Sequence, residues 1–197
     1  MKKTETKSVL LVGVGGQGTI LASKILTTGL IAAGYDVKMS EVHGMSQRGG
    51  SVSTQVRYGS KVYSPIIGKG EADVLVSFET MEALRYLDGL KPGGKIVVND
   101  YHMPSLPVLS GEKEYPDGII DELKSKAPTL ALDAAQVARE NGNPRGMNVV
   151  LLGTLIQLLG ITNVDWPAAL KANVKPQLVE GNLRCLDAGM KLAESIS

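Results

Sequence analysis

Short apolar runs alternate with segments of helical periodicity along the first half of the chain. Residues 8–13 form an apolar run with charged residues before it and a glycine at its end, which is typical of a strand buried on both faces. Residues 16–33 carry apolar side chains at helical spacing and are followed by Gly34, which favours a helix that ends there. Residues 35–40 predict a second short strand, so that residues 8–41 form one βαβ-like unit.

The pattern changes to strict alternation in the next segment. Residues 52–58 alternate between apolar and polar side chains, and Gly59 and Ser60 separate them from a short run at 61–64. Gly followed by Ser between two such runs is typical of a type II′ turn. We therefore expect a β-hairpin at this point, as an excursion from the main sheet.

The remaining chain predicts a second βαβ unit, one more strand and several helices. The βαβ unit is expected from a strand at 72–77, a helix at 79–87, a turn at 90–94 and a strand at 95–99. Further helices are expected at 117–127, 134–141, 147–159, after a cap at Asp165, and at 176–195, with a loop at 101–118 and a last strand at 129–133.

This order of elements predicts an α/β fold in one domain over residues 1–197. The architecture is a Rossmann-like, mostly parallel sheet with flanking helices, a β-hairpin excursion and a helical C-terminal third.

Charge and hydropathy exclude some classes of partner. The 21 Lys and Arg residues almost balance the 20 Asp and Glu residues, so we expect neither nucleic acid nor an anionic membrane as a partner. The longest apolar stretch, 147–161, is too short to span a bilayer, and the first residues lack the apolar run of a signal peptide. We expect a cytoplasmic protein.

Cysteine usage limits the redox chemistry of this chain. Cys185 is the single cysteine, so the chain forms no internal disulfide and lacks the roughly four thiolates that an iron–sulfur cluster needs. With His43 and His102 as the only histidines, we expect no metal site. Redox metal chemistry, if the protein takes part in any, is expected on another chain.

Two glycine-containing loops are the candidate functional segments, and the first follows the first predicted strand. Gly13, Gly15 and Gly18 fit the dinucleotide fingerprint, in which a phosphate approaches the loop and the start of the next helix. Glu41 follows the second strand, where an acidic side chain would hold a ribose hydroxyl. Glycines at this spacing also allow close packing of a helix on a strand, and Glu41 also fits a solvated strand end. The candidate cofactor-binding residues of this part are Gly13, Gly15, Gly16, Gln17, Gly18 and Glu41.

The second loop, at residues 41–51, places charged side chains among glycines. His43 is a candidate hydrogen-bond donor or proton shuttle, and Arg48 a candidate clamp for a carboxylate or phosphate. Each residue alone also fits an ordinary surface position, but the combination favours function. Because both loops follow successive strands of one βαβ unit, we expect them side by side at one edge of the sheet. The further candidate cofactor-binding residues are Gly44, Gln47, Gly49 and Gly50.

Other polar and reactive residues fit structural roles. Glu79 follows a strand and could equally cap the helix that starts there, His102 is expected at the surface, and Cys185 and Trp166 are expected to pack in the core. The chain carries no nucleophile elbow, Walker lysine, zinc-protease motif or paired-carboxylate motif. We therefore expect no self-contained catalytic machinery.

Four segments, at residues 13–18, 40–51, 61–65 and 70–74, together carry a resemblance to a known family. They resemble the beta subunit of indolepyruvate ferredoxin oxidoreductase, the counterpart of the gamma subunit or domain of 2-oxoacid:ferredoxin oxidoreductases. The glycine loop is shared by the superfamily, whereas the His-Gly-Met-Ser-Gln-Arg-Gly-Gly run is more specific to the indolepyruvate branch. The resemblance covers most of the chain and is strongest over residues 9–100.

The resemblance implies an activity carried by a complex. A larger subunit is expected to bind thiamine diphosphate and [4Fe-4S] clusters, to decarboxylate an aryl pyruvate, and to pass electrons to ferredoxin while coenzyme A (CoA) accepts the acyl group. This chain lacks the Gly-Asp-Gly…Asn motif for thiamine diphosphate. It is therefore expected to bind neither cofactor alone, to be inactive alone, and to complete the partner's active site, with His43 and Arg48 as contributors.

Three alternatives remain at this point. The complex could act on another 2-oxo acid. The glycine spacing and Glu41 also fit a stand-alone nucleotide-dependent dehydrogenase, although the missing catalytic set argues against it. A nucleotide-sensing or scaffold module fits the first loop, but the second loop argues against it.

Overall fold

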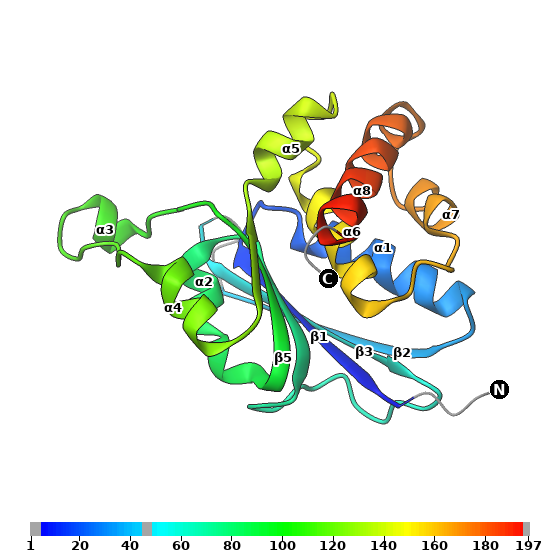
Figure 1. Ribbon diagram of the computed structural model, residues 1–197, viewed down its shortest axis with the longest axis horizontal. Coiled ribbons are helices and arrows are strands. Elements are labelled where there is room, and N and C mark those ends of the chain that lie inside the picture. Colours follow the sequence, from blue (N-terminus) through cyan, green and yellow to red (C-terminus); the bar gives the residue numbers. More distant parts are fainter. Residues whose placement is uncertain (1–4, 45–48, 195–197) are drawn as a thin grey trace.

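The computed structural model describes residues 5–44 and 49–194 (Figure 1). Within them, six strands form a mixed sheet in the order β2-β3-β1-β4-β5-β6. All strands except β3 run in the same direction, because β3 is antiparallel to both of its neighbours and the other pairs are parallel. The strands are β1 (Lys7–Val14), β2 (Asp36–His43), β3 (Ser51–Gly59), β4 (Ala72–Ser77), β5 (Leu90–Asn99) and β6 (Thr129–Leu132).

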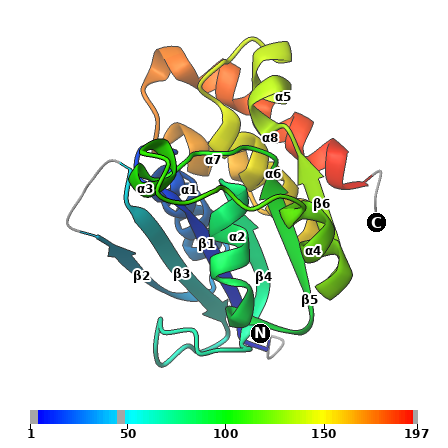
Figure 2. The ribbon, with the colours of Figure 1, turned by 90° about the vertical axis from the view of Figure 1, so that its left-hand side faces the viewer.

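Helices cover both faces of the sheet (Figures 1 and 2). On one face lie α1 (Thr19–Ala32), α5 (Ala134–Glu140), α6 (Met147–Leu159), α7 (Trp166–Lys171) and α8 (Val179–Glu194), the last preceded by η2 (Pro176–Leu178). On the other face lie α2 (Thr80–Arg85), followed by η1 (Leu87–Gly89), and α4 (Ile119–Lys126). A one-turn helix, α3 (Leu106–Leu109), lies on a segment that projects from the body.

Two apolar cores fill the space between the sheet and these helices. Successive residues of β1 point to opposite faces, so Leu11 packs with Ile25 on the α1 and α6 side, whereas Leu10 packs with Leu123 on the α2 and α4 side. The predicted α/β class and mostly parallel sheet are thereby confirmed, as is the helical C-terminal region.

The predicted position of the β-hairpin was wrong. No strand follows Gly59 at residues 61–64; instead, β3 pairs with β2 from Asp36↔Gly59 to His43↔Val52, so the hairpin connection is the segment 44–50. The alternation in β3 was interpreted correctly as a strand, but its partners come from before it in the sequence.

The segment after β3 is bonded by side chains of that strand and does not pair with its backbone. The backbone N–H of Ile67 donates to Gln55 Oε1 at 2.6 Å, and Arg57 Nη1 donates to the Ile66 carbonyl at 2.9 Å. These two polar side chains of β3 take the place of a strand partner for the Ile66 carbonyl and the Ile67 N–H.

Smaller differences concern the ends of elements. β5 begins at Leu90, within the predicted turn, and reaches its regular pairing with β4 only after a register irregularity. The predicted loop at 101–118 contains the single turn of α3, and the predicted last helix begins as the 3-10 turn η2.

Helices α6 and α8 approach closely because each has a glycine at the contact. A Cβ on Gly153 would lie 2.1 Å from the Leu186 carbonyl oxygen, and a Cβ on Gly189 would lie 2.0 Å from the Val150 carbonyl oxygen. The Thr154 hydroxyl donates to the Gly189 carbonyl at 3.1 Å across the same contact. Backbone therefore packs on backbone in the core of the C-terminal region.

Cys185 in α8 and Trp166 at the start of α7 are both buried, which confirms their predicted core positions. Burial raises the pKa of the Cys185 thiol, so this side chain remains a neutral packing group. The Trp166 ring lies against Gly29 of α1, where a Cβ would be 2.4 Å from Cζ3.

We expect Gly189→Ala to destabilise the protein by about 2 kcal/mol, because the added methyl group collides with the α6 backbone and the helices must separate. Gly181→Ala in the same helix is the matched control. Its Cβ would lie 3.3 Å from Asn143 Cβ, a contact that a shift of a few tenths of an ångström relieves, so we expect the free energy of unfolding to change by less than about 1 kcal/mol. Urea unfolding of both variants tests this, and equal free energies of unfolding would contradict it.

Candidate functional site at the carboxyl edge of the sheet

The two loops singled out in the sequence meet at one edge of the sheet. β1 ends where β3 begins, with Val14 opposite Ser51, and β3 lies against the end of β2, with His43 opposite Val52. The Gly15 N–H donates to the Gly50 carbonyl at 2.9 Å, which joins the loops directly. Their predicted position side by side is confirmed, with β3 standing between β1 and β2.

The side chain of Gln17 closes the glycine loop from within. Its Oε1 accepts the Val14 N–H at 2.7 Å, and its Nε2 donates to the Phe78 carbonyl at 3.1 Å. A Cβ on Gly13 would lie 2.8 Å from the same Gln17 Oε1, so Gly13 is needed for packing. Of the candidate cofactor-binding residues, these two therefore have their contacts inside the protein.

The two positive-φ glycines of the loop differ in their surroundings, since Gly16 faces open space and Gly18 packs against α6. Gly16 and Gly18 have φ angles of 104° and 85°, in the left-handed region that glycine adopts readily. A Cβ on Gly16 would meet nothing within 4 Å, so this side of the loop is open. A Cβ on Gly18 would lie 2.6 Å from Asn148 Nδ2, which donates to the Gly18 carbonyl at 3.2 Å and ties the start of α1 to α6.

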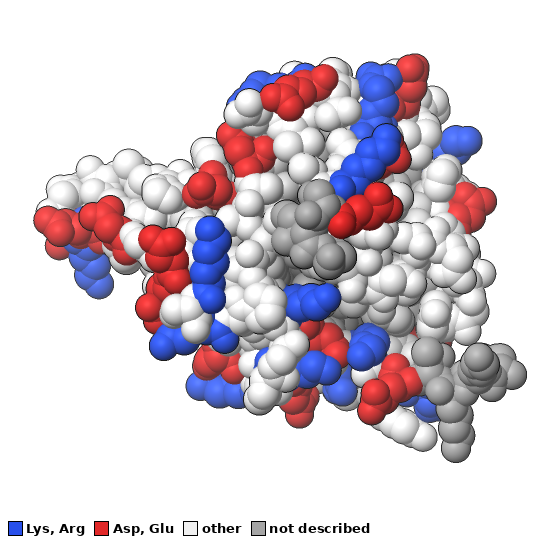
Figure 3. Space-filling view, viewed as in Figure 1, with Lys and Arg blue, Asp and Glu red and all other residues white. Residues whose placement is uncertain are grey.

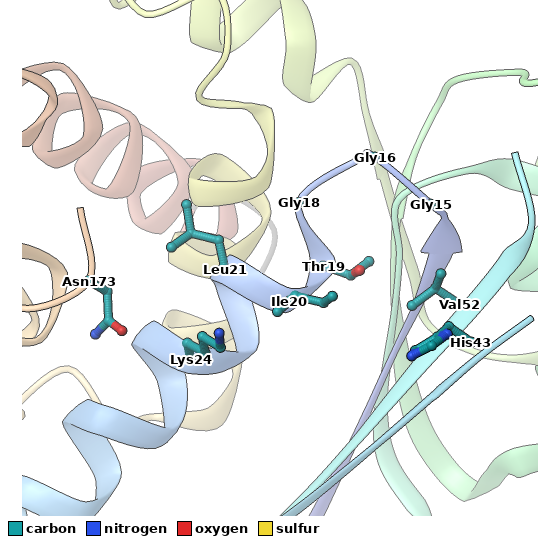
Figure 4. Close-up of a pocket in the computed structure, with 10 residues that line it drawn as sticks. All are labelled: Gly15, Gly16, Gly18, Thr19, Ile20, Leu21, Lys24, His43, Val52 and Asn173. Atoms are coloured by element: carbon teal, nitrogen blue, oxygen red, sulfur yellow. The ribbon is translucent and has the colours of Figure 1, made fainter. Parts of the chain in front are cut away.

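A cavity of about 610 Å³ lies in front of this loop (Figure 4). Figure 4 shows the glycine loop and the first turns of α1 along it, Lys24 and Asn173 toward one end, and His43 and Val52 toward the other. The residues that line it are Gly15, Gly16, Gly18, Thr19, Ile20, Leu21, Lys24, His43, Val52 and Asn173.

The chemistry of the cavity suits an anionic group attached to an apolar body. The 14-residue helix α1 starts there with no acidic side chain in its first turn, and its first N–H groups have no acceptor within the helix. Lys24 adds a cation one turn along, and Ile20 and Val52 add apolar surface. A helix N-terminus with a nearby lysine is an established type of phosphate site.

Glu41 lies further from this cavity than the sequence suggested. It is not at the end of β2, which continues to His43, but lies opposite Thr54, two residue pairs further into the strand. Among the described residues, neither Glu41 Oε1 nor the Thr54 hydroxyl has a hydrogen-bond partner, although both atoms are buried. Glu41 as a ribose ligand stays a prediction.

The second loop is described only at its two ends. His43 is exposed, contacts the Gly44 carbonyl through Nδ1 at 3.2 Å, and lines the cavity; Gly49 is also exposed. Gln47 and Arg48 lie outside the described residues.

A second cavity of about 620 Å³ lies between the start of β3, helix α2 and the projecting segment. Its base contains two buried glutamates, Glu79 and Glu82. Glu82 accepts hydrogen bonds from the Ser51 hydroxyl and from Arg85 Nε at 3.0 Å, which ties the start of β3 to α2. Glu82 could not be recognised from the sequence, since a glutamate in a helix carries no local sign of burial.

Glu79 caps helix α2, which confirms the capping alternative. Its Oε2 accepts the Glu82 N–H at 2.9 Å, and its Oε1 accepts the Met103 N–H at 3.1 Å and the Tyr115 hydroxyl. Burial, together with the hydrogen bond to Glu79, raises the pKa of Tyr115, which therefore stays a neutral donor. His102 is exposed as predicted, and its ring stacks on Tyr115.

The part of the chain that the structure describes contains neither a candidate metal site nor a candidate membrane-spanning helix. Over residues 5–44 and 49–194, no group of three or more His, Cys, Asp or Glu side chains is placed to hold a metal ion. No helix in these ranges is long and apolar enough to cross a bilayer. Positive and negative side chains are interspersed over much of the face in Figure 3.

The model of the pyruvate ferredoxin/flavodoxin oxidoreductase family matches residues 8–192. The chain belongs to this family. This confirms the resemblance that the two loops carried in the sequence.

Relatives within the family match almost end to end. The chain is 38% identical over 197 residues to indolepyruvate oxidoreductase subunit IorB of Thermococcus kodakarensis, covering 96% of each protein. It is 39% identical to the subunit of the same name from Pyrococcus horikoshii, again over 96% of each protein.

Solved structures of the oxidoreductase family share the fold. The gamma subunit of a keto/oxoacid ferredoxin oxidoreductase from Geobacter sulfurreducens PCA matches with a TM-score of 0.69 at 25% identity, over 96% of this chain and 99% of that one. A 2-oxoglutarate:ferredoxin oxidoreductase from Magnetococcus marinus matches with a TM-score of 0.77 at 24% identity; all of this chain corresponds to 32% of that one. The latter likeness concerns the fold alone.

Proposed function

We propose that this chain completes the active site of a larger, cofactor-bearing subunit. The chain is a subunit of a multi-subunit 2-oxoacid:ferredoxin oxidoreductase of the indolepyruvate type. The observation that supports its place at the active site is the meeting of the two loops at one sheet edge, joined by the Gly15–Gly50 hydrogen bond.

The proposed reaction divides the chemistry between the chains. A 2-oxo acid and CoA give acyl-CoA, carbon dioxide and a proton, and two electrons leave to ferredoxin. Thiamine diphosphate would supply the carbanion chemistry, and [4Fe-4S] clusters the electron path, on the larger subunit. The single cysteine of this chain, buried in α8, fits that division because one thiol cannot ligate a cluster.

The glycine loop is proposed to hold a phosphate of CoA. The first N–H groups of α1 and the Lys24 ammonium supply the charge, and the apolar residues of the 610 Å³ cavity supply contact for the rest of the molecule. A dinucleotide bound by the isolated chain would use the same groups, so ligand binding alone does not distinguish a subunit from a dehydrogenase or a sensor.

The second loop is proposed to face the thiamine diphosphate cleft or the CoA entrance. His43 already lines the cavity at the end of β2. Arg48 follows in the hairpin connection, where a guanidinium can bind the substrate carboxylate or a CoA phosphate through two hydrogen bonds. Both contacts would hold the substrate in place and leave the bond-breaking steps to the larger subunit.

The subunit function is tested by isolating the complex from its host and measuring viologen or ferredoxin reduction with indolepyruvate and CoA. We expect CoA-dependent reduction that disappears when this chain is omitted and returns when it is added back. Phenylpyruvate and a branched-chain 2-oxo acid, run in parallel, identify the substrate class. A chain that copurifies with no larger subunit and binds NAD would contradict the proposal and favour the dehydrogenase or sensor alternative.

We expect Arg48→Ala to lower kcat/KM for the 2-oxo acid or CoA by about 10- to 100-fold, because one charge-assisted contact is lost. The assembled complex should form as before. Arg139→Ala is the matched control, since Arg139 is an exposed arginine on α5, paired with Asp133. Unchanged kinetics of the Arg48 variant would exclude the contact.

We expect Lys24→Ala to raise KM for CoA about three- to tenfold and to leave KM for the 2-oxo acid unchanged, because a cation next to the phosphate site is removed. Lys124→Ala, an exposed lysine on α4, should change neither constant. Steady-state kinetics of the assembled complex measure both. An equal rise in both KM values would mean that Lys24 acts on the active site as a whole.

A further inference from the structure

The segment 101–118 projects from the body as an arm with apolar side chains at its tip (Figure 1). Leu106 and Leu109 of α3 are 79% and 70% exposed. Three residues apart on one helical turn, they lie on the same side of it. Two leucines exposed together at the end of a projection are a costly arrangement for a chain in water.

The base of the arm is held firmly by buried groups. Met103 near its start and Tyr115 near its end both donate to the carboxylate of Glu79, which is 1% exposed. Tyr115 also bonds the Thr80 hydroxyl at 2.6 Å and accepts the Met81 N–H at 3.1 Å. One buried carboxylate therefore fixes both ends, and the leucines are presented at a defined place relative to α2.

The arm forms one wall of the 620 Å³ cavity at the carboxyl edge. Leu106 and Leu109 line that cavity together with Met103, and Gly49 and Ser51 line the side nearest the second loop. A segment inserted here would touch the arm and the start of β3 at once. The cavity thus adjoins the edge at which the two loops meet.

The arm is acidic around its apolar tip. Between residues 101 and 118, Glu112, Glu114 and Asp117 are opposed by Lys113, so three negative charges against one positive charge leave a net charge of −2. Figure 3 shows acidic side chains along the lower side of the projection and an uncharged upper side. A partner surface that fits would have an apolar centre and basic residues around it.

We propose that this arm docks the larger subunit of the complex, whose apolar segment with basic flanks seats between α3 and Ser51. The proposal rests on the proposed function, because it takes the occupant from the complex to which the chain contributes. A second copy of this chain fits the charges poorly, since a two-fold contact through the arm would set one acidic segment against another.

The test is the dissociation constant for assembly of this chain with the purified larger subunit, measured for Leu106→Ser/Leu109→Ser. We expect it to rise at least about tenfold, since exposed apolar anchors at an interface carry much of the affinity. Ile31→Ser/Leu178→Ser, at positions 60% and 49% exposed elsewhere on the surface, is the matched control and should change the constant less than twofold. Thermal unfolding confirms that both double variants fold, because all four side chains are exposed.

A second pair of variants tests the charge. Glu112→Lys/Glu114→Lys should weaken assembly and reduce its dependence on salt, because attraction to basic residues is lost. Assembly unchanged in the leucine variant, or tightened in the charge variant, would overturn the proposal. Sedimentation of the isolated wild-type chain and of the leucine variant tests the alternative occupant, a second copy of this chain. If the wild-type chain self-associates and the leucine variant does not, the docking proposal is overturned in favour of that second copy. If the wild-type complex reduces ferredoxin while the leucine variant assembles normally, the docking proposal fails and the proposed function stands.

Discussion

The antiparallel pairing of β3 with both β1 and β2 determines the arrangement of the carboxyl edge. Because β3 runs against its neighbours, it begins at the edge where β1 and β2 end. The residue before β3, Gly50, therefore lies beside the glycine loop and within hydrogen-bond distance of Gly15. With β3 in that register, Ser51 also reaches Glu82 and links the hairpin to α2. Both cavities of this edge are bordered by the first residues of β3.

Local periodicity was sufficient to predict most elements but not how one of them pairs. The uniform apolar run of β1 and the apolar spacing of α6 each depend on residues next to one another in the chain, so their type could be predicted. The alternation in β3 indicates a strand with one buried face, and it is the same whichever strands lie beside it. Gly59 does end β3, but the contacts of the following segment with Gln55 and Arg57 are tertiary and leave no periodic pattern.

The cavity residues that lie in the two loops could be predicted from the sequence. Those that come from other elements could not be predicted from the loops. Gly15, Gly16, Gly18 and His43 gather at one cavity because short loops follow successive strand ends. Lys24 could have been found from its position one turn into α1. Asn173, just after the end of α7, lines the cavity because α7 packs against α1. No local sequence pattern indicates that contact.

The internal hydrogen bonds of Gln17 have a consequence for how substrate preference can change in evolution. Because that side chain bonds Val14 and Phe78, an outside ligand meets main-chain N–H groups, those of Gly16, Gly18 and the first turn of α1. Main-chain groups are the same for every residue type, so mutation cannot tune them without disturbing the loop. Divergence toward a new substrate would then leave the loop almost constant and alter the side chains around it, or those of the neighbouring subunit. One loop shape would in this way serve members of the family that differ in the acid they oxidise.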